Sequence, residues 1–382
     1  MNKTDELEEI AHIGGKVTFD IITDAGGKRS SKVGWSASIA TPASLFAIYA
    51  LPQGVPVGDI VLGGIGTPFN PAPVAGCLPV FIASDTTGMF GRQCSSCGGY
   101  WRGPFGARIC PYCGIRVEGA YRFMTDAQLR YVKHYCETFA DALASDTPQR
   151  HVIDLDAVVD ATGTARKPAF YYAEERQQNL FTCSACSEIT DVLGTYSYCS
   201  ACGTRNDLEE LGKIIKGIRN SVNSGGSPET CAKECVAAFD SCAAQYAKQL
   251  AARIPMTGAR KARLERALFH NLHASAELFR EYFGIDILDG LSEDERAFAT
   301  LMFYRRHVYE HKGGEADARY IAESGDDVRP KQALRETRES VHRLANCIVR
   351  LGTNLHSGFQ DIFPPIKEPI QQREEERGVS TS

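Results

Sequence analysis

The chain has 382 residues, of which 43% are hydrophobic and 23% are charged, and its formal net charge at pH 7 is −5. This length is enough for about two to four domains, and the composition is that of an ordinary globular protein. A net negative charge argues against a protein that holds long nucleic-acid duplexes by its overall field, so any contact with nucleic acid has to use a local patch.

The N-terminal residues are acidic and lack the apolar core of a secretory signal. No segment approaches the ~18 consecutive apolar residues of a membrane-spanning helix. We therefore expect a cytoplasmic protein without a membrane partner. Fourteen cysteines are many for that compartment, and eight of them form four Cys-x-x-Cys pairs, which indicates metal binding rather than disulfides.

Residues 1–90 have the pattern of a β-rich domain. Short apolar runs such as Lys16–Thr23 and Leu78–Ala83 are separated by turns rich in glycine and proline. The glycines at 63, 64 and 66 lack the lysine and the following helix of a P-loop, so we interpret them as turn residues. No catalytic constellation is visible in these residues. The remaining hypothesis for this domain is that it binds a protein partner.

Two cysteine clusters follow, one within residues 91–120 and one within residues 181–206. Both have the spacing Cys-x2-Cys-x12-Cys-x2-Cys, and they start 89 residues apart, so they form an internal repeat. Four thiolates suit tetrahedral Zn²⁺ and leave no position for a catalytic water, which predicts two structural zinc ribbons. Iron–sulfur binding and redox chemistry are alternatives that do not require this paired spacing. The predicted zinc ligands are Cys94, Cys97, Cys110, Cys113, Cys183, Cys186, Cys199 and Cys202.

The loop of the first cluster combines aromatic and cationic side chains. Tyr100, Trp101, Arg102 and Arg108 have the composition of a surface that binds single-stranded nucleic acid. The alternative is that Trp101 packs on the ribbon or on a neighbouring sheet. The sequence favours packing and leaves both interpretations open.

The segments beside the second cluster are a connector over residues 121–180 and a helix with a linker over residues 207–226. In the connector we predict a helix over 125–144 that opens with a capping box, and then strands at 151–159 and 169–172. The run Asn223–Ser227 is rich in serine and glycine and predicts a domain boundary.

Residues 227–363 predict a bundle of four helices, at about 228–254, 259–283, 292–312 and 330–359. Long helices with short connections favour an antiparallel arrangement. The charged segment 364–382 is predicted to be a disordered tail. The fold class is therefore α+β and multidomain, with an N-terminal β-rich domain, two zinc ribbons and a C-terminal antiparallel helical bundle.

The third predicted helix ends in the segment with the densest polar chemistry. Arg306 and His311 are five residues apart, which is about 500° of rotation, so their side chains project about 140° apart. Such a pair suits phosphodiester chemistry, because histidine can move a proton and arginine can stabilise charge on phosphorus. The alternative is a solvated helix end, where cations interact favourably with the helix dipole.

The run Arg306-His307-x-x-x-His311, with Gly313-Gly314-x-x-Asp317-x-x-Tyr320 after it, resembles the motif of the HEPN family. HEPN domains are small helical domains that are often ribonucleases, and the resemblance covers about residues 227–363. Lys312 stands where the family commonly has asparagine. The resemblance implies metal-independent cleavage of RNA by 2′-OH attack, with an active site formed across a homodimer.

Four residues receive roles from this resemblance. Arg306 would stabilise the scissile phosphate, and His311 would act as general base or acid. His307 would tune the site or hold substrate, and Arg305 would add affinity for phosphate. The biological role implied is that of a toxin or an anti-phage defence effector. The alternative is a zinc-ribbon adaptor that binds nucleic acid or protein and dimerises through the bundle, with Arg306 and His311 structural.

Overall fold

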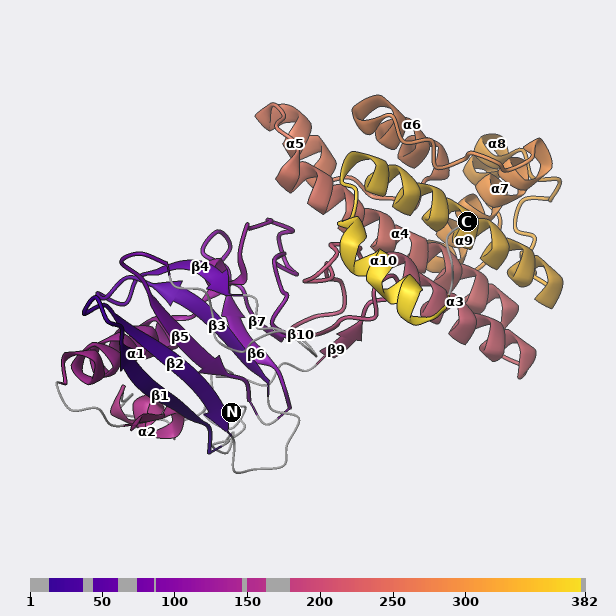
Figure 1. The fold of residues 1–382 in the computed structure, drawn as a ribbon. Coiled ribbons are helices and arrows are strands. Elements are labelled where there is room, and N and C mark those ends of the chain that lie inside the picture. The colour runs from indigo at the N-terminus through magenta and orange to yellow at the C-terminus, as the bar shows by residue number, and fades with distance from the viewer. Residues whose placement is uncertain are drawn as a thin grey trace. The chain divides into compact units, whose positions relative to one another are not determined.

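The chain divides into two units in the computed structural model, which describes residues 14–36, 44–60, 74–85, 87–145, 150–162 and 179–378. The first unit contains residues 1–194, 198–203 and 367–382, and holds the sheets and both cysteine clusters. The second unit contains residues 195–197 and 204–366 and is helical (Figure 1). The predicted combination of N-terminal sheets, two four-cysteine clusters and a helical C-terminal region is confirmed.

Two three-stranded antiparallel sheets form the N-terminal part of the first unit. One has the order β2 (Arg29–Ser36), β1 (Lys16–Thr23), β8 (Arg150–Asp154). The other has the order β4 (Pro56–Ile60), β3 (Leu45–Ala50), β5 (Leu78–Ala83). Alternate residues of β1 face the core, while β3 and β5 are buried along most of their length, and together these side chains form one apolar core.

Helix α1 (Asp126–Ala144) covers this core and begins at the predicted capping box of Thr125 and Gln128. The ring of Phe139 in α1 lies 4.4 Å from that of Phe19 in β1, measured between centroids. The strand predicted over 151–159 is shorter than expected. It ends at Asp154, whose carboxylate accepts hydrogen bonds from the next backbone N–H groups and so begins α2 (Leu155–Ala161). The strand predicted at 169–172 and the glycines at 63, 64 and 66 lie outside the described residues.

The two cysteine clusters share one four-stranded sheet. Its order is β6 (Phe90–Gln93), β7 (Tyr100–Gly103), β10 (Ile189–Val192), β9 (Asn179–Thr182), so each cluster supplies one hairpin. The hairpins meet where Asp191 of β10 pairs with Arg102 of β7. The two repeated cysteine motifs therefore lie next to each other in the structure.

The helical unit contains α3 (Asp207–Asn223), α4 (Pro228–Arg253), α5 (Gly258–Glu265), α6 (Leu272–Phe283), α7 (Glu293–His311), α8 (Ala318–Ser324) and α9 (Arg338–Ile362). Helix α4 packs against α3, α7 and α9. Among the described helices, none is both long enough and apolar enough to span a membrane.

Helix α3 belongs to the helical unit, so the domain boundary predicted at 223–227 lies elsewhere. Leu211, Ile215 and Ile218 of α3 are buried, and the helix packs against α4 and α9. The glycine-rich run is only the turn from α3 to α4, and Gly225 occupies it with a φ of 95°. The helical unit therefore starts at residue 204, apart from the short contribution of residues 195–197.

Two of the predicted helices have different bounds in the structure. The helix expected over 259–283 is divided into α5 and α6, because the N–H of Phe269 donates to Asp240 in α4 and Asn271 caps α6. The helix expected from residue 330 starts at Arg338, where Thr337 and Ser340 form a capping box.

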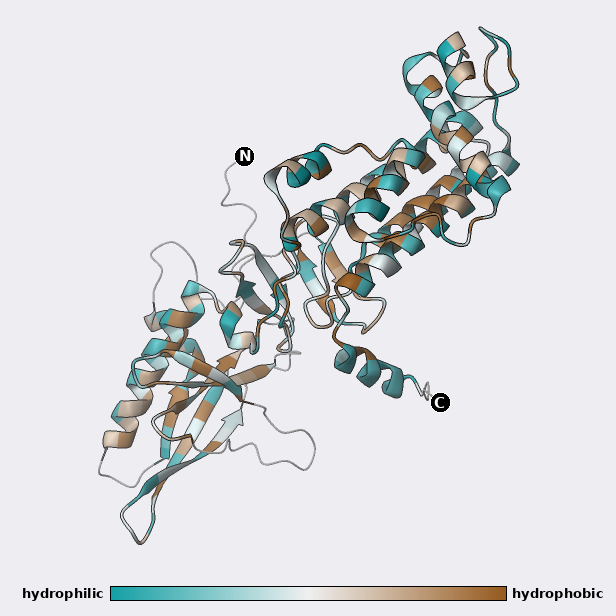
Figure 2. Ribbon diagram, turned by 90° about the horizontal axis from the view of Figure 1, so that it is seen from above, coloured by the Kyte–Doolittle hydropathy of each residue, from teal (hydrophilic) through white to brown (hydrophobic). Residues whose placement is uncertain are grey.

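The tail is helical over α10 (Lys367–Glu376), which corrects the prediction of disorder for these residues. Helix α10 is almost entirely polar (Figure 2). It groups with the first unit because Ile370 packs against the second cysteine cluster, and because Arg373 and Arg377 donate hydrogen bonds of 3.0 and 2.9 Å to the Ser187 hydroxyl. These long-range partners are invisible in the sequence of the tail itself.

The turn between β3 and β4 generates a stability prediction. Gly54 has a φ of 83°, and a Cβ atom there would lie 2.4 Å from the Cα of Lys133 in α1. We expect Gly54→Ala to lower the free energy of unfolding of the first unit by ~3 kcal/mol, from backbone strain and overpacking together. Urea titration followed by tryptophan fluorescence measures it, since both tryptophans, Trp35 and Trp101, lie in this unit.

Gly27 is the matched control, because its φ is 81° and an added Cβ there meets nothing within 4 Å. Gly27→Ala should lower the free energy of unfolding by about 1 kcal/mol, from backbone strain alone. Equal losses in the two variants would contradict the close approach of Gly54 to α1.

Candidate functional site

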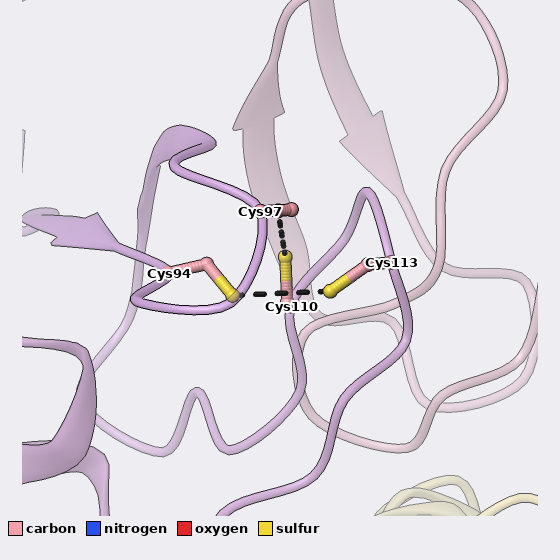
Figure 3. Close-up of side chains that lie close together, drawn as sticks. All are labelled: Cys94, Cys97, Cys110 and Cys113. Carbon is pink, nitrogen blue, oxygen red and sulfur yellow. Dashed lines mark hydrogen bonds between the residues drawn. The ribbon is translucent and has the colours of Figure 1, made fainter. Parts of the chain in front are cut away.

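The cysteine clusters have the geometry of tetrahedral metal sites. A metal ion with four sulfur ligands at about 2.3 Å defines a tetrahedron with S–S edges of about 3.8 Å. The Sγ–Sγ distances are 3.8 Å for Cys94–Cys113 and 3.6 Å for Cys97–Cys110 (Figure 3). In the second cluster they are 3.6 and 3.5 Å. Since all four sulfurs of each cluster lie within 4.8 Å of one another, each cluster can hold one metal ion, as predicted for Cys94, Cys97, Cys110, Cys113, Cys183, Cys186, Cys199 and Cys202.

A tight turn places each pair of sulfurs on one side of the backbone. In the first cluster the N–H groups of Gly98 and Gly114 donate to the carbonyl oxygens of Cys94 and Cys110, at 2.8 and 2.9 Å. The residue that follows the second cysteine of each pair has positive φ, which favours glycine. Ser187 is the exception among the four, with a φ of 62°.

The two clusters differ in their exposure to solvent. Cys97 of the first cluster is exposed, whereas all four cysteines of the second are buried. Helix α10 contributes to this protection, because it packs on the second cluster and its arginines bind the Ser187 hydroxyl. A chelator or an oxidant therefore has easier access to the first cluster.

Of the aromatic and cationic residues predicted in the first loop, Trp101 and Arg102 belong to the interior, whereas Tyr100 is half-buried and Arg108 is exposed. Trp101 is fully buried, with its ring 4.9 Å from that of Phe123. Arg102 is also buried and pairs with Asp85 at 2.7 Å and Asp191 at 3.3 Å. The packing interpretation of Trp101 is confirmed, and neither Trp101 nor Arg102 can present a nucleic-acid surface.

The motif of the helical unit lies at the C-terminal end of α7. The helix ends at His311, as the sequence indicates, and the two glycines that follow have φ of 62° and 83°. Phe303 anchors α7 to α4 through an edge-on contact with Phe239, with centroids 5.8 Å apart. In the last turn Val308 is buried, whereas the side chains of His307 and His311 are exposed.

Arg305 is held by acidic side chains, which argues against its predicted role as a phosphate ligand. Its guanidinium group lies 2.9 Å from Asp326 and 2.9 Å from Glu336. The hydroxyl of Tyr309 donates to the same Glu336 at 2.7 Å, and that of Tyr320 donates to Asp326. Partial burial opposes the charged form of Arg305, but the bonds and charge of Glu336 outweigh it and raise its pKa. With two carboxylates matched to it, Arg305 fastens the segment after α7 to the helix.

Arg306 is in a different environment from its neighbour. It is half-buried, its Nε atom is buried without a hydrogen-bond partner, and no carboxylate pairs with it among the described residues. Glu310, one turn further along, is instead paired with Lys233 of α4 at 3.2 Å. An unpaired donor of this kind costs free energy in the folded protein. A bound anion would satisfy it.

His307 and His311 lie side by side on the last turn, with ring centroids 4.8 Å apart. Partial burial and the nearby charges of His311 and Lys312 lower the pKa of His307 below its ordinary value. His307 is therefore mainly neutral at pH 7 and able to accept a proton. The structure brings His307, rather than Arg306, next to His311, which agrees with the angular separation expected from the helix.

A cavity of about 300 Å³ adjoins His307 between α6, α7 and α8. Its α7 wall follows helical spacing, with Thr300, Tyr304 and His307 on one face. Sequence reasoning missed this wall, because the partners across the cavity come from α6 and α8. The full lining is His270, Asn271, Leu272, Thr300, Phe303, Tyr304, His307, Val308, Lys312, Asp317, Arg319, Tyr320 and Glu323.

Comparisons of the chain with protein-family models, with curated proteins and with solved structures found no match. The chain's own residues supply two four-cysteine clusters, an Arg306 with a buried Nε that lacks a hydrogen-bond partner, and an exposed histidine pair beside a cavity.

The difference in exposure predicts unequal loss of metal. Zinc-loaded protein treated with an excess of chelator should release one equivalent at least ~10-fold faster than the second, because Cys97 is open to solvent. A colorimetric chelator records the two phases. The variants Cys97→Ser and Cys186→Ser assign them, since each should remove one phase. Release of both equivalents at a single rate would contradict the assignment.

Proposed function

We propose that the helical unit is a metal-independent endoribonuclease and that the two cysteine clusters are structural zinc sites. The observation that supports it best is the contrast between adjacent arginines. Arg305 is neutralised by Asp326 and Glu336, whereas Arg306 has a buried Nε without a partner. A phosphate diester carries the acceptor oxygens and the negative charge that Arg306 lacks.

The histidine pair supplies the proton transfers. In this proposal neutral His307 accepts the proton of the ribose 2′-OH as the oxygen attacks phosphorus. Protonated His311 donates a proton to the departing 5′ oxygen. Their 4.8 Å separation lets both reach groups on a single phosphate, and Arg306 stabilises the charge that develops on the non-bridging oxygens. No step needs a metal ion.

The substrate in this proposal is single-stranded RNA. The cavity beside His307, about 300 Å³ in volume, has room for one nucleotide. Tyr304 offers a ring for stacking, and Lys312 and Arg319 add positive charge to the lining. A net charge of −5 for the chain disfavours long duplexes, which require broad electrostatic contact.

A homodimer completes the site in this proposal. Arg306 and His311 project in different directions from one helix, so one scissile phosphate would use Arg306 of one copy and the histidines of another. Such a two-fold arrangement is the commonest form of protein assembly. By the HEPN resemblance, the enzyme would act as a toxin or an anti-phage defence effector.

Zinc in each cluster would stabilise the fold rather than take part in the reaction. Four thiolates fill a tetrahedral shell and leave no position for water or substrate. The adaptor alternative is weakened for the first ribbon, because Trp101 and Arg102 are buried. It remains the interpretation that follows if the helical unit proves inactive.

Substitution of the motif should abolish cleavage of RNA. We expect Arg306→Ala and His311→Ala each to lower the rate in EDTA by at least ~100-fold, since each removes a charge-stabilising or proton-transferring group. His273→Ala is the matched control, because His273 is a helical histidine of the same unit whose side chain is 79% exposed and lies 3.5 Å from Glu277. Its rate should stay within about twofold of the wild type.

Zinc content and circular dichroism of each variant separate lost chemistry from lost folding. Mixing Arg306→Ala with His311→Ala subunits should restore about a quarter of the wild-type rate, since half of the dimers then carry one intact composite site. Wild-type rates in both single variants would contradict the catalytic assignment. Inactive mixtures of folded, dimeric variants would contradict the composite site.

The pH dependence of cleavage should report the lowered pKa of His307. Because partial burial and nearby cations disfavour its protonated form and lower its pKa, the rate should rise with pH on this limb with a midpoint below pH 6.5. Lys312→Gln removes one of those cations, so the limb should move to higher pH. Lys216→Gln, at an exposed position of α3, should leave it in place. NMR titration of the His307 ring gives the same pKa without turnover, and an unshifted value in Lys312→Gln would contradict this account.

A further inference from the structure

The first unit contains a second cavity, of about 490 Å³, unrelated to the motif on α7. It lies where the start of β2, the start of β5 and the last turns of α1 come together. Both β2 and β5 are edge strands of their sheets, so the cavity opens between two sheet edges. Its floor is apolar and is formed by Tyr49, Leu78, Pro79, Phe139 and Leu143.

The rim of this cavity is basic. Lys28, Arg29 and Lys32 line it together with Ser30 and Ser31, and none of the described lining residues is a carboxylate. Arg29 is already engaged, because it donates to the carbonyl oxygen of Leu143 at 2.6 Å at the end of α1. The ammonium groups of Lys28 and Lys32 form no ion pair with any described residue. Asp20 lies opposite Lys32 on the neighbouring strand and is itself paired with Arg150 at 2.9 Å.

Lysines on an edge strand have a simpler explanation, since they discourage pairing with another sheet. That explanation does not account for the apolar surface beside them. Ile22 and Val74 line the same cavity and are 51% and 44% exposed. An open apolar surface under a cationic rim is a feature of ligand sites, in which apolar walls hold the body of a ligand and a few polar groups orient it.

We propose that this cavity binds a small organic anion. The apolar or aromatic body of the ligand packs on Leu78 and Phe139, and its phosphate, sulfonate or carboxylate group lies at Lys28 and Lys32. The volume is within the range of sites for small molecules. The site is independent of the ribonuclease proposal, because all of its residues belong to the first unit.

A pair of fluorescent probes that differ only in charge tests the proposal. The full-length, zinc-loaded protein is titrated with 8-anilinonaphthalene-1-sulfonate and with its neutral analogue, N-phenyl-1-naphthylamine. We expect the double variant Lys28→Ala/Lys32→Ala to bind the sulfonate about tenfold more weakly and the neutral probe unchanged. The charge-matched control is Lys216→Ala/Lys248→Ala, two exposed lysines of the helical unit, which should bind both probes as the wild type does.

Cys77 reports the location of the bound probe, because this half-buried thiol lines the cavity. Alkylation of Cys77, followed by peptide mass spectrometry, should slow by at least ~5-fold when the sulfonate is bound at saturation. An unchanged alkylation rate in the wild-type protein, or equal weakening of both probes in a lysine variant whose circular dichroism matches that of the wild type, would overturn the proposal.

Competition identifies the body of the natural ligand. Displacement of the sulfonate by octanoate indicates an aliphatic carboxylate, and displacement by adenosine monophosphate indicates an aromatic phosphate ester. If neither displaces it, the cavity does not accept such anions and the proposal fails.

Discussion

The ion pairs of Arg305 with Asp326 and Glu336 determine how the motif of the helical unit is presented. They join the end of α7 to the segment that follows it and to Glu336, two residues before α9 begins. Removing one partner from such a partly buried group leaves an unmatched charge, at a cost of about 3–5 kcal/mol in buried cases. The segment held in this way includes α8, whose residues Arg319, Tyr320 and Glu323 line the cavity beside His307. Arg306, one residue on, is left without an acidic partner among the described residues.

The first unit also contains an arginine paired with two carboxylates, and there the ion pairs join two hairpins. Arg102 lies between Asp85 and Asp191 and is 5% exposed. Asp191 belongs to the second cluster and Arg102 to the first, so this buried ion pair joins hairpins that are far apart in sequence. Metal binding would hold the two Cys-x-x-Cys turns of each cluster together, while Arg102 sets the register between the hairpins of the two clusters. In each unit, then, an arginine paired with two carboxylates joins segments that are distant in sequence.

Local chemistry was predictable from the sequence. The spacing of the cysteines located eight side chains that meet in two clusters. The Thr125 capping box and the paired glycines after His311 located one helix start and one helix end. These features involve residues within a few positions of one another, or ligands whose chemistry leaves few choices.

Features that depend on distant partners were not predictable. The polar sequence of α10 resembles a disordered tail, and only Ile370 and the Ser187 hydroxyl give the helix a place to bind. Asn223–Ser227 has the composition of a linker, but the buried face of α3 makes it an internal turn. Arg305 and Arg306 are indistinguishable by type and position. Their different roles come from Asp326 and Glu336, which are 21 and 31 residues away from Arg305.

The central claim is that the helical unit cleaves RNA through the 2′-OH, without a metal ion. The most direct measurement is the chemistry of the product ends after incubation of a defined single-stranded RNA in EDTA, read by mass spectrometry. Attack by the 2′ oxygen leaves a 2′,3′-cyclic phosphate on one fragment and a 5′-hydroxyl on the other, and the account predicts these ends. Fragments with 3′-hydroxyl and 5′-phosphate ends, or cleavage that appears only when divalent metal is added, would contradict it.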